Sequence, residues 1–129
     1  MNRAKILILN DDDIVAELQK RLFLAHRPKN GQLLIFSHHK SAKAALAAGA
    51  WGFHLILADP SASEGIRGLQ IKNPDADIYA VTSMPKSAVG DGSPLEIPVK
   101  GVVRWASEGK FTHFVKNWFW DQAIFSATG

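Results

Sequence analysis

Five short, continuously apolar runs recur along the chain at intervals of about 24 residues. Their positions are KILIL at 5–9, QLLIF at 32–36, FHLILA at 53–58, DIYAV at 77–81 and GVV at 101–103. Apolar runs without polar alternation are typical of strands that are covered on both faces, as in a parallel sheet. Each interval is long enough for a strand and a crossover helix. The pattern therefore predicts a doubly wound α/β domain.

The segments between the runs carry helical signals of unequal strength. A first helix is expected where apolar residues recur at helical spacing, at Ile14, Val15, Leu18, Leu22 and Ala25. Asp12 or Asp13 is placed to cap it. A second helix is expected from the cap residue Ser41 to Gly49, which favours a C-terminal stop. A third helix over 64–72 is predicted more weakly, because two glycines interrupt it.

The fourth connection breaks this rhythm. Segment 84–100 holds three prolines and two glycines, and proline removes a helix donor and restricts the residue before it. We expect an irregular loop there, with the fourth helix degenerate or replaced. The last helix is expected over 107–125. The whole is predicted to form one domain, 1–125, followed by a short tail, 126–129.

Composition excludes several classes of protein. The chain has 129 residues and no cysteine, which excludes disulfides and thiolate metal sites. Its net charge of +3 is dispersed, so we do not expect direct binding to nucleic acid. No apolar run approaches the ~20 residues that cross a bilayer, and the first run is too short for a signal peptide. We expect a cytoplasmic protein that does not enter membranes.

Polar residues follow the predicted strands at the edge where a parallel sheet gathers its ligands. NDDD at 10–13 follows the first run, Asp59 the third, Thr82 and Ser83 the fourth, and Arg104 the fifth. Clustered carboxylates repel one another unless a cation neutralises them, and their hard oxygen atoms suit Mg²⁺. A carboxylate held there is also a candidate nucleophile toward a phosphoryl group.

These strand ends resemble the receiver domain of bacterial two-component response regulators over essentially the whole chain. KILILNDDDIVAEL resembles the receiver opening, HLILADP its phosphoacceptor strand, YAVTS its switch-hydroxyl strand, and GVVRWAS its last strand. The resemblance implies a flavodoxin-like fold: a five-stranded parallel sheet in the order 2-1-3-4-5, with helices on both faces.

The resemblance also implies a role for each matching residue. Asp59 takes the position of the phosphoacceptor and holds Mg²⁺ together with Asp11, with Asp12 as a further candidate ligand. Three residues are expected to hold the phosphoryl oxygens or switch with them: Thr82, Ser83 and Arg104. The implied partners are a histidine kinase or phosphotransfer protein and a downstream protein or effector domain. The implied function is signalling through protein contacts, without enzymatic turnover.

Four departures keep alternatives open. Asn10 replaces the first acid of the receiver pair, Arg104 replaces a lysine, and Trp105 replaces a proline. Asp59 and Thr82 are 23 residues apart, about one helical turn fewer than is usual in receivers. Because guanidinium and ammonium groups are not equivalent at a crowded site, Arg104 could instead pair with Asp59. That pairing would give a pseudo-receiver that binds partners without phosphorylation. A metal-dependent phosphohydrolase is a third, weaker alternative.

Aromatic residues and histidines offer two further signals. Trp105, Phe119 and Trp120 are predicted to contribute to an interaction surface, and an aromatic C-terminal helix is consistent with a homodimer. The five histidines show no metal-ligand spacing, so we expect them to be solvated or packed. The acidic run 11–13 also has a purely structural interpretation, as a cap of the first helix.

Overall fold

The computed structural model describes residues 3–29, 31–82, 97–105 and 109–128, with side chains described up to Gln122. Five parallel strands form one sheet in the order β2-β1-β3-β4-β5, as the resemblance implied. The strands are β1 (Arg3–Leu9), β2 (Leu33–His39), β3 (Leu55–Ala58), β4 (Asp77–Thr82) and β5 (Gly101–Arg104). The helices are α1 (Asp13–His26), α2 (Ala42–Ala47), a 3-10 turn η1 (Pro60–Ala62), α3 (Ile66–Lys72) and α5 (Lys110–Thr128).

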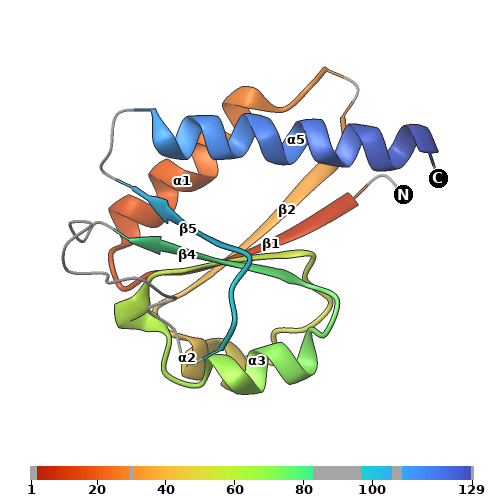
Figure 1. Ribbon diagram of the computed structural model, residues 1–129. Helices are drawn as coiled ribbons and strands as arrows, with labels where there is room; N and C mark the ends of the chain where they lie inside the picture. The colour runs from red at the N-terminus through yellow and green to blue at the C-terminus, as the bar shows by residue number, and fades with distance from the viewer. Residues whose placement is uncertain (1–2, 30, 83–96, 106–108, 129) are drawn as a thin grey trace.

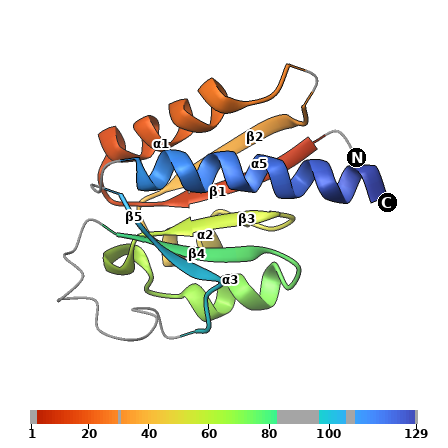
Figure 2. The same cartoon turned by 45° about the horizontal axis from the view of Figure 1, so that its top comes forward.

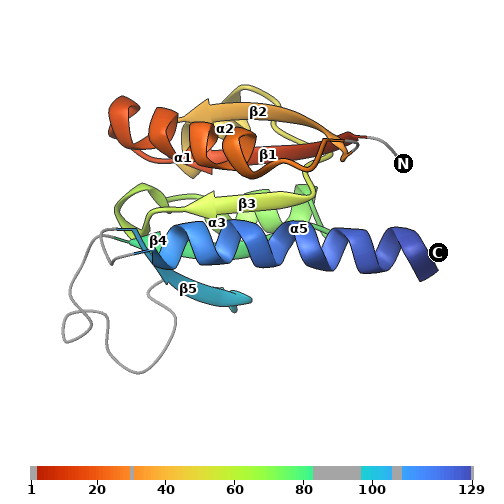
Figure 3. The same ribbon diagram turned by 90° about the horizontal axis from the view of Figure 1, so that it is seen from above.

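Helices cover both faces of the sheet, as predicted. Figure 1 shows α1 and α5 on one face and α2 and α3 on the other, and the turned views in Figure 2 and Figure 3 agree with this arrangement. Because side chains alternate between the two faces of a strand, the core consists of two clusters, one on each face of the sheet. Leu7 and Ile56 pack on the α2–α3 side, whereas Ile8 and Leu57 pack on the α1–α5 side. Burying each such side chain contributes about 1.5–3 kcal/mol.

Helix α1 turns a different face to the sheet than its aliphatic residues predicted. Its buried residues are Ala16, Gln19 and Phe23, which are spaced three and four apart. Ile14 and Leu18, two of the apolar residues whose spacing indicated the helix, are 73% and 44% exposed. The reason is that Phe23 is the largest apolar side chain of the helix and fills the space beneath α5. Ala16 and Gln19 lie on the same helical face as Phe23 and are therefore buried with it.

Helix α5 contributes most of the aromatic core on the same face. Phe23 of α1 meets four of its rings edge-on, with centroid separations of 5.6–6.4 Å: Phe111, Phe114, Trp118 and Phe119. The expectation that Phe119 is exposed is therefore wrong, because this residue closes the cluster and is only 8% exposed. Trp120, one position further along, is 67% exposed, as expected of a surface residue.

Two expectations concern the ends of elements. The last helix begins at Lys110 and runs to Thr128, so residues 126–128, expected as a tail, continue the helix. The loop expected in place of the fourth helix falls largely on residues 83–96, outside the described part of the chain. The third helix is real, and Gly65 caps it with a φ of 90°, a conformation that glycine adopts readily. None of the described helices is long and apolar enough to span a bilayer.

Candidate functional site

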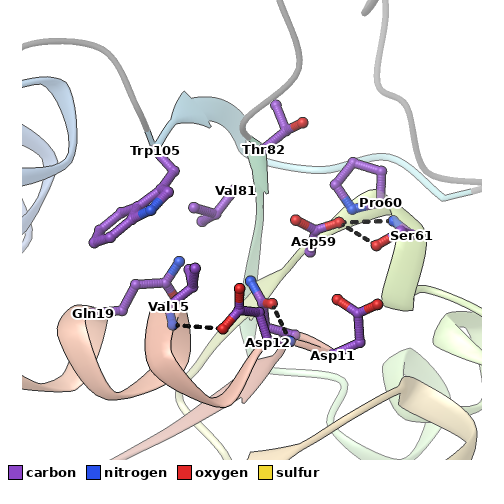
Figure 4. A pocket seen from close by; sticks show the side chains of 11 residues that line it. Asp11, Asp12, Val15, Gln19, Asp59, Pro60, Ser61, Val81, Thr82 and Trp105 are labelled. Atoms are coloured by element: carbon purple, nitrogen blue, oxygen red, sulfur yellow. Dashed lines mark hydrogen bonds between the residues drawn. The ribbon is translucent and has the colours of Figure 1, made fainter.

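A pocket lies at the carboxyl edge of the sheet, where β1, β3 and β4 end (Figure 4). It has a volume of about 530 Å³, which lies in the range of small-molecule and cofactor sites. The residues that line it are Asn10, Asp11, Asp12, Val15, Gln19, Asp59, Pro60, Ser61, Val81, Thr82 and Trp105. Most of the strand-end residues singled out in the sequence thus meet in one cavity. The parallel register brings this about, because β1 and β3 end side by side.

Asp59 is fixed at the end of the central strand. Its backbone N–H donates to the carbonyl of Leu9 over 2.9 Å, which extends the ladder between β3 and β1 by one residue. Its carboxylate Oδ1 accepts hydrogen bonds from Ser61 N at 2.9 Å and from Ser61 Oγ at 2.7 Å. Asp59 thereby caps η1, where Pro60 occupies the first position. These bonds orient the carboxylate and leave Oδ2 as the oxygen that Ser61 does not engage.

Asn10 and Asp12 shape the turn between β1 and α1. The Asn10 side chain is buried, and its Oδ1 accepts from Asp12 N over 2.8 Å. The Asp12 carboxylate in turn caps α1, because its Oδ1 accepts from Ile14 N at 2.9 Å and from Val15 N at 3.3 Å. The structural interpretation of the acidic run therefore holds for Asp12. Asp11 is exposed, and Figure 4 shows its carboxylate turned toward that of Asp59.

The last two strands bring Thr82 and Arg104 into register as direct neighbours. Thr82 is 1% exposed and lines the pocket, and its carbonyl accepts from Trp105 N over 2.9 Å. The described lining does not include Arg104, since side chains alternate along β5 and Trp105 faces the pocket instead. The described ion pairs do not join Arg104 to Asp59. Ser83, also expected at the site, falls outside the described residues.

The pocket is strongly acidic. Its described lining holds three carboxylates, those of Asp11, Asp12 and Asp59, and neither lysine nor arginine. Such a cluster is stabilised by a bound cation. Mg²⁺ typically takes one or two protein carboxylates and keeps several waters, so Asp11 and Asp59 fit it. The three aspartates do not form a group that could hold one metal ion between them, and no other three His, Asp or Glu side chains of the described residues do so.

Five lining residues were not predicted as site residues from the sequence: Val15, Gln19, Pro60, Ser61 and Val81. Ser61 had a usable signal, because a serine two residues after an aspartate often forms a local turn with it. Gln19 had a weaker one, since it shares a helical face with Ala16 and Phe23. Val15 and Val81 look like ordinary core residues, and only the fold shows that they reach the pocket.

His38 supports the turn from outside the pocket. Its Nε2 lies 2.7 Å from the carbonyl oxygen of Asn10, and its Nδ1 lies 3.9 Å from Asp13 Oδ1. An N–H on Nε2 donates to this carbonyl. This histidine is therefore packed, as expected of the five, but it has an acidic neighbour that the sequence did not reveal.

No protein-family model matches the chain, and no curated protein matches it in sequence. Several solved structures share its fold. RcsB, a response regulator of Salmonella typhimurium, superposes with a TM-score of 0.66 at 17% identity, over 90% of this chain and 58% of RcsB. A chain from the complex of the CheA3 P1 domain with CheY6 of R. sphaeroides gives 0.63 at 16% identity, over 92% and 97%.

A response regulator of Burkholderia pseudomallei gives a TM-score of 0.53 at 19% identity, over 94% of this chain and 74% of that protein. Its crystal structure contains a phosphorylated aspartic acid, a calcium ion and citrate. The chain thus has the fold found in response regulator receiver domains. At these identities the likeness concerns the fold, and the function has to be argued from the site.

Proposed function

We propose that the chain is a receiver-like signalling domain and that Asp59 accepts a phosphoryl group from a phosphohistidine. The observation that carries this proposal is the position of Asp59. Its carboxylate closes the central strand of the sheet and faces a pocket that also collects Asp11 and Thr82 from neighbouring strand ends. A phosphorylated aspartate in a structural neighbour with the same fold supports the chemistry.

The transfer follows from the orientation of the carboxylate. Ser61 holds Oδ1, so Oδ2 is the attacking oxygen. A bond forms between Oδ2 and phosphorus while the N–P bond of the donor breaks, and the leaving imidazole nitrogen takes up a proton from water. Asp11 and Asp59 would hold Mg²⁺, which when bound offsets the negative charge of the carboxylates and the phosphoryl group. Thr82 lines the same pocket and would donate its hydroxyl to a phosphoryl oxygen.

The signal would leave through the last two strands. Thr82 lies opposite Arg104 in the β4–β5 ladder, and its carbonyl accepts a hydrogen bond from Trp105 N. A shift of Thr82 toward a phosphoryl group would therefore displace the end of β5 with it. Trp105 packs on Phe111, with 5.1 Å between the two ring centroids, and this contact links the end of β5 to α5. Added charge at Asp59 would in this way bias the surface of α5 that carries Trp120.

The proposed upstream partner is a histidine kinase or phosphotransfer protein, and the downstream partner is a protein or effector domain. The complex of the CheA3 P1 domain with CheY6 among the structural neighbours supports the first of these. We place this exchange in the cytoplasm and propose that the chain signals rather than turning over a substrate.

Fluorescence offers a direct test, because Trp105 lines the pocket. Beryllofluoride, which mimics the phosphoryl group, is titrated into the protein with Mg²⁺ while tryptophan emission is followed. We expect a saturable change that Asp59→Asn abolishes and that Trp105→Phe reduces. Trp120→Phe is the matched control, since Trp120 is exposed and lies outside the pocket lining. The absence of any change in the folded wild-type protein would contradict phosphoacceptance.

One observation favours a second candidate, a pseudo-receiver that binds partners without phosphorylation. Asn10 replaces an acid, and its side-chain oxygen is already engaged by the backbone of Asp12. The sequence left open a locked form of such a domain, in which Arg104 pairs with Asp59. A pseudo-receiver would instead rest on weak metal binding. It predicts no response to beryllofluoride at millimolar Mg²⁺, together with a partner complex that survives Asp59→Asn.

A further inference from the structure

The pocket is larger than a site for a metal ion and a phosphoryl group requires. Beyond the three carboxylates it continues between α1, β4 and the end of β5, where Val15, Val81 and Trp105 form an apolar wall. Figure 4 shows the indole of Trp105 above Gln19 and Val15, on the side of the pocket away from Asp59 and Ser61. The cavity thus has one anionic end and one apolar, aromatic end.

Gln19 supplies an independent indication of a ligand. It is 1% exposed, and its Nε2 is buried without a hydrogen-bond partner in the described structure. Buried polar atoms are nearly always paired, so an unpaired amide on a cavity wall calls for an acceptor. Rotating the amide by 180° about the Cγ–Cδ bond exchanges the positions of its nitrogen and oxygen. Because Nε2 has no hydrogen-bond partner, this rotation breaks none of its bonds. The donor can therefore be presented to the cavity.

The charge at the other end defines the complementary group. Asp11, Asp12 and Asp59 face the cavity without a lysine or arginine in the described lining. An ammonium group satisfies the carboxylates as a metal ion does and can carry an organic body, which Mg²⁺ cannot. An aromatic ring near Trp105 gains by stacking or edge-to-face contact.

We propose that this pocket binds a small organic amine. Its ammonium group lies against Asp11 and Asp59, its flat apolar body lies between Val15, Val81 and Trp105, and one hydrogen-bond acceptor on that body receives the Gln19 amide. The proposal goes beyond phosphoacceptance and does not depend on it. Because both cations use the same carboxylates, amine binding and Mg²⁺ binding compete.

The test uses three matched probes and the full chain without Mg²⁺. 4-Methoxyphenethylamine carries the ammonium, the ring and an ether acceptor, and phenethylamine lacks the acceptor. 3-(4-Methoxyphenyl)propanoate keeps the ring and the acceptor but carries the opposite charge. Binding is followed by the ¹⁵N shifts of the Gln19 side-chain amide and the Trp105 indole. We expect saturable shifts with the methoxy amine, about fivefold weaker binding without the acceptor, and none with the carboxylate.

Two variants and one control identify the residues. Gln19→Met removes the donor at nearly constant volume. It should weaken binding of the methoxy amine about fivefold, to the affinity of phenethylamine, and leave the binding of phenethylamine unchanged. Trp105→Leu should weaken the binding of both amines, and Trp51→Leu, which changes an exposed tryptophan outside the pocket lining, should weaken the binding of neither. Added Mg²⁺ should displace the amine.

Three results would overturn the proposal: no saturable shift with either amine, equal binding of amine and carboxylate, or affinities that Gln19→Met and Trp105→Leu leave unchanged. Failure here is distinguishable from failure of phosphoacceptance. The amine titrations need neither Mg²⁺ nor a phosphoryl analogue, and the beryllofluoride response needs no amine.

Discussion

Replacing Gln19 by methionine should make the protein more stable. The side chain is 1% exposed, and its Nε2 is buried without a partner in the described structure. Methionine has a similar length and helix propensity and carries no group that requires a hydrogen bond. The substitution therefore removes an unpaired polar group from the α1–sheet interface and keeps most of the packing around Phe23.

The size of the effect follows from the burial. An amide held out of water without a hydrogen bond costs about 1–3 kcal/mol in proteins, so the free energy of unfolding should rise by about that amount. For a chain of 129 residues the unfolding entropy near the midpoint is about 0.27 kcal/mol/K. Each kcal/mol then raises Tm by about 4 °C, which gives an expected increase of about 4–11 °C.

Thermal unfolding followed by circular dichroism, together with urea titration, measures this change. The control is Arg21→Met on the same helix, where the side chain is 72% exposed and pairs with Glu17. It should alter the free energy of unfolding by less than about 0.5 kcal/mol. A Tm for Gln19→Met that is equal to or below that of the wild type would contradict the presence of a costly unpaired amide. It would mean that water or the backbone satisfies the amide.

Three other changes test the account. Phe23→Ala should lower the free energy of unfolding by about 3–5 kcal/mol in urea titrations, because it empties the centre of the aromatic cluster; a loss under 1 kcal/mol contradicts this. Burial raises the pKa of Tyr79, the one tyrosine of the chain, above 10.0. The stability that the protonated phenol contributes is thus present below pH 10.0 and is lost as the pH rises through the pKa of the folded state. A pH titration of the phenolate absorbance measures this pKa, and a midpoint in the folded protein no higher than in the urea-unfolded protein would contradict the shift. Asn10→Asp adds a carboxylate and should tighten Mg²⁺ binding roughly tenfold, as measured by calorimetry. An unchanged affinity would mean that a charge at position 10 does not act on the bound ion.

The fold could be predicted because its signals are local and repeated. Each apolar run identifies a strand, and the run spacing identifies a crossover connection. The face of α1 could not be predicted in the same way. Ile14 and Leu18 are more apolar than Gln19, and only the packing of Phe23 beneath α5 explains why the glutamine is buried.

The site could be predicted where a strand end determines it. Asp11, Asp59 and Thr82 meet because adjacent parallel strands end at one edge. Arg104 and Trp105 show the limit of this reasoning. Arg104 is the last residue of β5 and Trp105 is the next residue, and side-chain alternation decides which of them faces the pocket. Hydrogen bonding likewise separates the acids of the first turn, since Asp12 caps α1 while Asp11 faces Asp59.

The most direct test of phosphoacceptance is to locate a phosphoryl group on the chain. The protein is incubated with acetyl phosphate and Mg²⁺, quenched in acid, and measured by intact and peptide mass spectrometry. The account predicts one added phosphoryl group, found on the peptide that contains Asp59 and absent from Asp59→Asn. An unmodified mass, or a phosphoryl group on another residue that persists in Asp59→Asn, would contradict it.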